Sequence, residues 1–288
     1  MTVRFDNRVA IVTGAGNGLG RRYALDLAAR GAKVVVNDLG GARDGTGGSV
    51  SAAQAVVDEI VAAGGEAMAS GASVTDADAI FAMVDEVKAK WGRIDILINN
   101  AGILRDKSFT KMSLDDFRAV VDVHLMGGVI CTKAVWDLMR EQAYGRILMT
   151  TSSTGLYGNF GQANYGAAKL ALEGAKYNVR VNTVAPLAAT RMTEDLMPAD
   201  LLAKMGPETV APASLYLVSE DAPTNVILNA GGGGFEAAHV TLTKGIHVSA
   251  DEMSVETVAA RIDSIRDRAG EAVPETGAAQ AMTALGGN

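Results

Sequence analysis

The sequence predicts an α/β protein built on a single doubly wound parallel sheet with helices on both faces. Short β-branched runs alternate with amphipathic helical patterns along most of the chain. A glycine-rich turn from Gly14 to Gly20 separates the first run from the first helical pattern, and Asp38 ends the second run. No Pro- or Ser-rich linker interrupts the alternation. We therefore predict one domain over residues 1–236 and a C-terminal extension over residues 237–288.

Each predicted strand is a short run of β-branched or aliphatic residues, and each predicted helix has apolar residues three or four apart. The predicted strands are 8–13, 33–38, 67–74, 94–99, 145–151, 179–184 and 225–228, the last of which ends the sheet. The predicted helices are 21–30, 51–63, 76–91, 115–140 and a helix that contains Tyr165 and Lys169.

The C-terminal extension has a pattern of its own. An apolar stripe with helical spacing predicts one amphipathic helix over residues 254–268. Residues 270–288 are rich in Ala, Gly and Thr, which predicts a poorly ordered, flexible tail.

Composition and charge exclude several classes of function. The net charge of −7 and the pI of about 5.1 argue against nucleic acid or an anionic membrane as the main partner. Cys131 is the single cysteine, so no internal disulfide forms, and we expect it to be buried. The chain lacks an apolar run of 18 residues and a basic-then-apolar leader, so we expect no membrane span and a cytoplasmic protein. His124, His239 and His247 lack metal-ligand spacing, so we expect no metal.

The glycine turn and Asp38 together predict a dinucleotide site. Glycines 14, 18 and 20 let the backbone approach a pyrophosphate closely, and the following helix N-terminus favours an anion. Asp38 lies eighteen residues after Gly20, where a carboxylate can accept hydrogen bonds from both ribose hydroxyls of NAD and repel the 2′-phosphate of NADP. The alternative is that Asp38 is a turn residue before Gly40. Arg43 is the nearest following arginine and keeps NADP as the alternative cofactor.

A tyrosine and a lysine four residues apart are the candidates for acid–base chemistry. Tyr165 and Lys169 leave the same face of a helix, and Ser152 lies thirteen residues before the tyrosine. A neighbouring ammonium lowers the pKa of a phenol, which can then take a proton from an alcohol. Alone, the spacing also fits a surface tyrosine and a solvated lysine.

Four motifs taken together resemble the short-chain dehydrogenase/reductases over residues 5–235: Thr13-Gly14-x3-Gly18-x-Gly20, Asn99-Asn100-Ala101-Gly102, Ser152 and Tyr165-x3-Lys169. The resemblance implies a Rossmann-like sheet, hydride transfer to or from a nicotinamide, and a homodimer or homotetramer. Tyr165 would be the acid/base, Lys169 would lower its pKa and hold the nicotinamide ribose, and Ser152, with Ser153 as the competing serine, would hold the substrate oxygen. The implied cofactor contacts are Gly14, Asn17, Gly18, Leu19, Gly20, Asp38, Ser73, Val74, Asn100, Ala101, Gly102, Tyr165, Lys169, Pro186 and Thr190.

Residues 34–41, 100–106 and 157–165 resemble more closely the (3R)-hydroxyacyl-CoA dehydrogenase domain of peroxisomal multifunctional enzymes and its bacterial relatives. This resemblance implies that NAD oxidises a (3R)-3-hydroxyacyl-CoA to the 3-oxoacyl-CoA. A 17β-hydroxysteroid dehydrogenase would use the same residues, and a dinucleotide-binding protein without catalysis is the third alternative. The candidates for the CoA phosphates are Arg105, Lys107 and Lys111, for which solvated charge is the other interpretation.

The chain departs from the short-chain dehydrogenase pattern in two places. His124 stands where most members place an asparagine that helps to hold a water of the proton relay; the hydroxyacyl-CoA subgroup also has histidine there, so His124 is a catalytic candidate. The other interpretation is a helix histidine bonded to backbone. Only eight residues separate Lys169 from Asn178, so the helix is about nine residues, or about 14 Å, shorter than in the family. A true deletion there would threaten the dimer and the placement of Tyr165 and Lys169.

Overall fold

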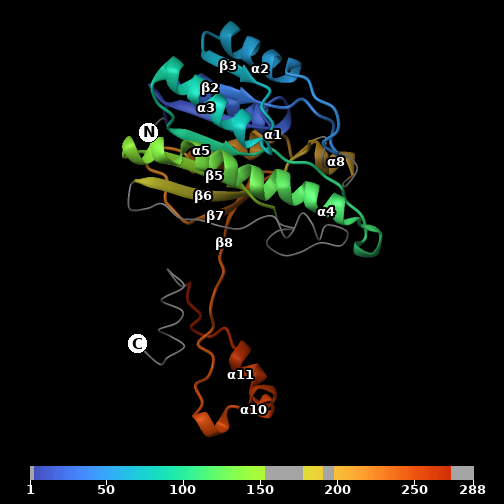
Figure 1. Ribbon diagram of the computed structural model, residues 1–288. Helices are drawn as coiled ribbons and strands as arrows, with labels where there is room; N and C mark the ends of the chain where they lie inside the picture. Colours follow the sequence, from blue (N-terminus) through green and yellow to red (C-terminus); the bar gives the residue numbers. More distant parts are fainter. Residues whose placement is uncertain (1–2, 153–177, 191–197, 274–288) are drawn as a thin grey trace. The chain divides into compact units, whose positions relative to one another are not determined.

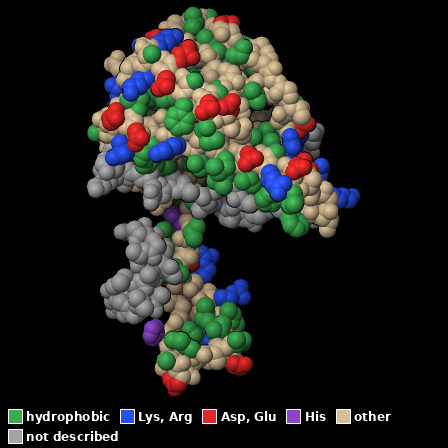
Figure 2. Space-filling model, viewed as in Figure 1, with side chains coloured by type: hydrophobic (Ala, Val, Ile, Leu, Met, Phe, Trp, Pro, Cys, Tyr) green, Lys and Arg blue, Asp and Glu red, His purple; other side chains and the backbone are tan. Residues whose placement is uncertain are grey.

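The computed structural model describes residues 3–152, 178–190 and 198–273. The chain divides into two compact units, Met1–Ala237 and Ala238–Asn288. Each unit is described by itself. In the first unit, basic and acidic side chains are interspersed over the face that Figure 2 shows.

The first unit is built on one eight-stranded sheet with the order β3-β2-β1-β4-β5-β6-β7-β8 (Figure 1). Neighbouring strands from β3 to β7 are parallel. The chain therefore winds outward from β1 to β3, returns beside β1 as β4, and winds outward again, which confirms the predicted doubly wound sheet. The strands are β1 (Val9–Thr13), β2 (Lys33–Asn37), β3 (Glu66–Ser70), β4 (Ile96–Asn99), β5 (Gly145–Thr150), β6 (Val179–Pro186), β7 (Ile227–Gly231) and β8 (Gly234–Ala238).

Helices cover both faces of this sheet (Figure 1). Successive strand residues point to opposite faces, and Val9 and Ala10 accordingly belong to different apolar cores. One core holds α1, α2 and α9, and the other holds α3 and α5. The helices are α1 (Gly18–Ala29), α2 (Ser51–Ala62), α3 (Ala77–Trp91), α4 (Leu114–Val121), α5 (Gly127–Glu141), α8 (Ala199–Leu202) and α9 (Ala211–Tyr216), with 3-10 turns η1 (Phe109–Lys111) and η4 (Pro207–Thr209).

Helices α4 and α5 are connected by the π-helical turn η2 (Asp122–Met126) and together form one long helical segment, which crosses the sheet in Figure 1. Over Leu114–Glu141 it is long and apolar enough to span a membrane by length and composition. Its inner residues Cys131, Val135 and Met139 lie in the core beside α3. We therefore interpret the segment as a core helix of this domain, which agrees with the helix predicted over 115–140.

Local signals explain why α3 begins and ends where it does. The Asp76 side chain accepts a hydrogen bond from the Ala79 N–H and caps the first turn. Gly92 adopts the left-handed conformation that ends the helix, with a φ of 77°. Lys88 and Lys90 place positive charge in the last turn, near the negative end of the helix dipole.

Two predictions about the later part of the chain are wrong in detail. Residues 225–228 do not end the sheet, because β8 follows β7 through Gly232 and Gly233, whose φ angles are 59° and 89°. Positive φ at both positions suits a two-residue hairpin turn. In the second unit, the single helix predicted over 254–268 is two short helices, α10 (Val255–Ala260) and α11 (Ile262–Arg266), because Arg261 leaves the helical conformation at a φ of −112° and a ψ of 14°; the 3-10 turn η5 (Ala250–Glu252) precedes them.

At the amino-terminal end of β4, a fully buried carboxylate ties the sheet together. Asp95 is 0% exposed, pairs with Arg8 at 3.1 Å and also with Arg93, and accepts a hydrogen bond from the Val9 N–H at 2.9 Å. The guanidinium of Arg8 also lies 3.7 Å from the centre of the Tyr144 ring. The carboxylate thus holds the start of β1 beside β4.

We expect Asp95→Ala to lower the free energy of unfolding by roughly 2–3 kcal/mol, because it removes a charged acceptor and leaves the Val9 N–H unpaired inside the protein. Urea unfolding followed by circular dichroism measures the change. Asp115→Ala is the matched control, since Asp115 is 90% exposed in its pair with Arg118, and it should leave the midpoint unchanged. Equal midpoints for both variants would contradict this role of Asp95.

Cys131 is buried, as predicted, at 2% exposure. Burial raises the pKa of its thiol to about 12, so at neutral pH it is protonated and shielded. We expect a disulfide reagent such as DTNB to modify the native chain slowly and to modify one thiol per chain rapidly in urea. A native thiol that reacts as fast as the unfolded one would show that Cys131 is accessible.

Candidate functional site

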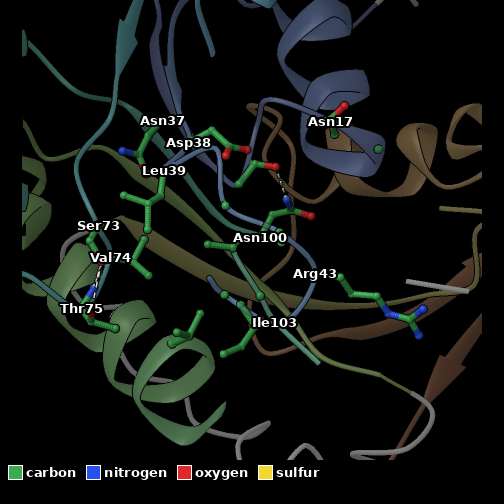
Figure 3. Close-up of a pocket in the computed structure, with 18 of the residues that line it drawn as sticks. Asn17, Asn37, Asp38, Leu39, Arg43, Ser73, Val74, Thr75, Asn100 and Ile103 are labelled. Carbon is green, nitrogen blue, oxygen red and sulfur yellow. Dashed lines mark hydrogen bonds between the residues drawn. The ribbon is translucent and has the colours of Figure 1, made fainter. Parts of the chain in front are cut away.

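A cavity of about 480 Å³ lies at the carboxyl ends of β1, β2, β3 and β4, where the winding of the sheet reverses (Figure 3). Doubly wound sheets bind ligands at this point, and the volume suits a small-molecule or cofactor site. Asn17, Asp38, Ser73 and Asn100 line it, each from a loop that follows a different one of these strands.

The ends of β1 and β4 are joined by two polar side chains. The Thr13 hydroxyl accepts hydrogen bonds from the N–H groups of Asn100 and Ala101, at 3.0 and 3.1 Å, and donates to the Ile98 carbonyl at 3.3 Å. The Asn100 amide donates to the carbonyls of Thr13 and Gly14, both at 3.0 Å. Asn100 therefore fixes the shape of the glycine turn while it lines the cavity.

The glycine turn requires glycine for space and for conformation. Gly14 and Gly18 have φ angles of 62° and 55°, which disfavour other residues. A Cβ at Gly14 would lie 2.8 Å from the Ala101 Cα, and a Cβ at Gly20 would lie 2.2 Å from the Gly14 carbonyl oxygen. Helix α1 starts at Gly18, three residues earlier than predicted, so the backbone N–H groups of its first turn lie at the cavity. Such a helix start favours an anion.

Asp38 lies at the end of β2 with both carboxylate oxygens held by backbone. Its Oδ2 accepts from the Gly16 N–H at 2.7 Å, and its Oδ1 accepts from the Gly40 N–H at 2.6 Å. These bonds fix the carboxylate on the cavity wall, and each oxygen keeps a lone pair for a further donor. The arrangement can bind a vicinal diol and places negative charge where a phosphate would meet it.

His124 does not line this cavity; it lines a smaller one that shares Ala101 and Val123 with it. The buried side chain is in η2, and its Nε2 lies 2.8 Å from the Ile103 carbonyl oxygen and 3.0 Å from the Ile103 nitrogen. The ring is so close to Gly102 that a Cβ there would lie 2.4 Å from its Cε1. His124 therefore supports the backbone at 102–103, and glycine at 102 makes room for it.

The structure brings together some predicted site residues and not others. The predicted residues that line the cavity are Gly14, Asn17, Gly18, Leu19, Asp38, Ser73, Val74, Asn100, Ala101, Gly102 and Thr190. Ser152 follows the end of β5 by two residues, and Pro186 ends the neighbouring strand β6. Tyr165, Lys169, Ser153 and the segments 157–164, 170–177 and 191–193 lie outside the described residues.

The sequence interpretation missed one wall of the cavity. The glycine-rich loop after Asp38 contributes Gly41, Ala42, Arg43 and Gly45, and the loop after β4 contributes Ile103 and Arg105. The glycine content of 40–48 indicates a loop, but its position depends on contacts with residues about sixty positions away. Because the carboxyl ends of parallel strands lie at one edge of a sheet, the loop after β2 could have been expected near the loop after β4.

The chain is similar to known oxidoreductases over most of its length. Residues 8–200 match the family described as short chain dehydrogenase. A short-chain type dehydrogenase/reductase of Mycobacterium tuberculosis is 48% identical over 274 residues, which cover 92% of this chain and 96% of that protein. A 3-oxoacyl-(acyl-carrier-protein) reductase of Synechocystis is 44% identical over 245 residues, 78% of this chain and 96% of that reductase.

Peroxisomal multifunctional enzyme type 2 of Drosophila melanogaster is similar in sequence and in structure. It is 50% identical over 254 residues, which cover 84% of this chain and 42% of the enzyme. Its full-length structure matches 99% of this chain and 50% of that chain, with a TM-score of 0.81 and 37% identity. The chain thus spans about half the length of this relative or less.

A 7α-hydroxysteroid dehydrogenase solved with NADH and 7-oxoglycochenodeoxycholic acid matches 80% of this chain and 95% of that chain, with a TM-score of 0.71 and 31% identity. The family generally binds NAD or NADP and is generally oligomeric. The matched family, the doubly wound sheet and the named relatives agree: the chain belongs to the short-chain dehydrogenases and is an oxidoreductase that acts on a CH–OH group.

Proposed function

We propose that the chain is an NAD-dependent dehydrogenase that oxidises a (3R)-3-hydroxyacyl-CoA to the 3-oxoacyl-CoA. The observation that supports NAD is Asp38, whose carboxylate lies on the cavity wall held by two backbone N–H groups. A diol can donate to this carboxylate, whereas a 2′-phosphate would be repelled. The similarity to the Drosophila multifunctional enzyme supports the hydroxyacyl substrate.

The residues of the cavity fit a dinucleotide in one orientation. The N–H groups of the glycine turn and of the start of α1 would bind the pyrophosphate. Asp38 would accept the hydroxyls of the adenosine ribose, and Ser73 and Val74 would flank the adenine (Figure 3). Asn100 would then lie toward the nicotinamide end, since it follows β4, on the other side of β1 from Asp38. Thr190 would lie near the start of α1, since a Cβ at Gly18 would be 3.4 Å from its Cγ2.

The acid–base chemistry follows the roles implied by the short-chain dehydrogenase motifs. Tyr165 would take the proton of the 3-hydroxyl, and Lys169 would favour its phenolate and hold the nicotinamide ribose. Ser152 would donate a hydrogen bond to the substrate oxygen. Bound NAD would accept the hydride from the carbinol carbon. His124 would support this region through the backbone at Gly102 and Ile103.

Two other substrates remain in contention. The likeness to a 7α-hydroxysteroid dehydrogenase supports a steroid alcohol, such as a 17β-hydroxysteroid, as the second candidate. The similarity to a 3-oxoacyl-(acyl-carrier-protein) reductase supports an acyl chain on a carrier protein, in the direction of reduction. Rates with hydroxyacyl-CoA thioesters, hydroxysteroids and 3-oxoacyl carrier protein, each with NAD(H) and NADP(H), separate the three. NAD reduction by a hydroxysteroid and by no thioester would overturn the hydroxyacyl proposal.

We assign the whole activity to residues 1–236 and propose a cytoplasmic homodimer or homotetramer, with no metal and no nucleic acid partner. Gel filtration with light scattering tests the assembly. A monomer would argue that the short segment after Lys169 has removed the dimer contact.

We expect Asp38→Ala to raise the KM for NAD by roughly 10- to 100-fold, because charge-assisted hydrogen bonds to the ribose are lost, and to raise the relative rate with NADP. Steady-state kinetics with both cofactors measures the change. Asp58→Ala, on the outer side of α2, is the matched control. An unchanged ratio of kcat/KM for the two cofactors would sink the assigned role of Asp38.

We expect Tyr165→Phe to lower kcat by roughly 10²- to 10⁴-fold while the Kd for NADH changes little, because the phenol transfers the proton. Tyr216→Phe, a half-exposed tyrosine on α9, controls for a general effect of losing a hydroxyl. If the wild-type chain binds NADH but turns over none of the three substrate classes, the chain is instead a dinucleotide-binding protein without catalysis.

A further inference from the structure

The loop that follows β2 crosses the cavity and bonds to the loop that follows β4. The Leu104 N–H donates to the Arg43 carbonyl at 3.0 Å, and the Arg105 Nε–H donates to the Asp44 carbonyl at 3.0 Å. Strand β1 lies between β2 and β4 in the sheet, so this link passes across the carboxyl end of β1. We refer to the pair of hydrogen bonds as the 43–105 link.

The glycine turn after β1, the loop after β2 and the loop after β4 form a closed ring of loops joined by hydrogen bonds, and the 43–105 link is one of its three sides. The glycine turn is joined to the end of β2 by the bond from Gly16 N–H to Asp38 and by the bond from Ala15 N–H to the Asn37 carbonyl, at 3.0 Å. It is joined to the loop after β4 by the Asn100 amide. Residues from all three loops line the cavity, so the ring surrounds the region where the pyrophosphate and adenosine ribose would lie.

The part of the ring contributed by residues 39–50 has a defined shape. The Ala42 N–H donates to the Thr46 carbonyl at 2.8 Å, and the Ser49 N–H donates to the Leu39 carbonyl at 2.8 Å, which closes the base of the loop. Gly45 has a φ of 87°, and a Cβ there would lie 3.1 Å from Ile103 Cγ2. The tip of the loop is therefore a tight turn packed on the loop after β4.

The 43–105 link differs from the other two sides of the ring in its surroundings. The other sides are attached directly to strand ends, where Thr13 and Asn37 are buried at 1% exposure. The bond from Arg105 to Asp44, by contrast, lies at an exposed position, and the Arg105 side chain is 29% exposed. Of these sides, the 43–105 link is thus the one that can open without disturbing the sheet.

We propose that the ring retains the dinucleotide: the 43–105 link opens for the cofactor to enter and leave, and Arg105 is the side chain that holds it closed. This inference rests on the proposed cofactor site. Arg105 is then a positioning residue, since it acts on the cofactor through the loop backbone at Asp44. On this proposal the 43–105 link obstructs entry and exit alike, so weakening the link should speed binding and release together.

The test is stopped-flow measurement of NADH binding and release by the full chain. Arg105→Met keeps the aliphatic stem and removes the donor to Asp44, together with the ion pair of Arg105 with Asp116 at 3.7 Å. Loss of the bond to Asp44 should raise kon and koff together by roughly 2- to 10-fold, with little change in Kd. Gly45→Ala, which adds a Cβ at positive φ against Ile103, should act in the same direction. Arg118→Met removes an exposed arginine from α4 and should leave both rates unchanged.

Two kinetic results would overturn the proposal that the ring controls exchange of the cofactor, and a failure to bind NADH would be a third. A higher koff with a lower kon in Arg105→Met would mean that the guanidinium attracts or contacts the cofactor itself. Rates equal to wild type in both Arg105→Met and Gly45→Ala would mean that the link does not control exchange. Failure of the proposed dehydrogenase activity is seen separately, because NADH exchange can be measured without any substrate. A wild-type chain that binds no NADH would overturn both proposals.

Discussion

The join between the carboxyl ends of β1 and β4 is the constraint on which the site depends. At this point the sheet reverses its winding, and two parallel strands end side by side with their next segments leaving in different directions. The Thr13 hydroxyl and the Asn100 amide satisfy the backbone groups that this divergence would leave without partners. The glycine turn, the start of α1 and the cavity above them all take their positions from this join.

Electrostatics in the cavity reconcile an acidic chain with an anionic cofactor. The net charge is −7, yet the cavity offers the N–H groups of the glycine turn and a helix start where a pyrophosphate would lie. Asp38 places its negative charge beside the glycine turn, where its Oδ2 accepts from the Gly16 N–H at 2.7 Å. Its remaining lone pairs are open to an uncharged ribose. Backbone dipoles would thus attract the pyrophosphate, and the fixed carboxylate beside them would favour a ribose diol over a 2′-phosphate.

The strands β1 to β7, the helices α1 to α5 and the cavity-lining motifs could be predicted from the sequence, because buried strands, amphipathic helices and glycine turns have strong local signals. The short helices α8 and α9 could not. The ion pairs of the buried Asp95 could not be predicted. An acidic residue inside an apolar run gives no local pattern from which its partner Arg8, 87 residues away, can be identified. Strand β8 was missed because its pattern of exposed residues lacks an apolar run. The ring was missed for a similar reason: the bonds of Arg43 and Asp44 are made to residues far along the chain.

A fluorescence titration of the wild-type chain with NADH and with NADPH at the same ionic strength tests most directly whether this cavity is an NAD site. We expect NADH to bind at least about ten-fold more tightly, because the ribose hydroxyls would donate to Asp38 and a 2′-phosphate would face its charge. Equal affinities, or tighter binding of NADPH, would contradict this expectation.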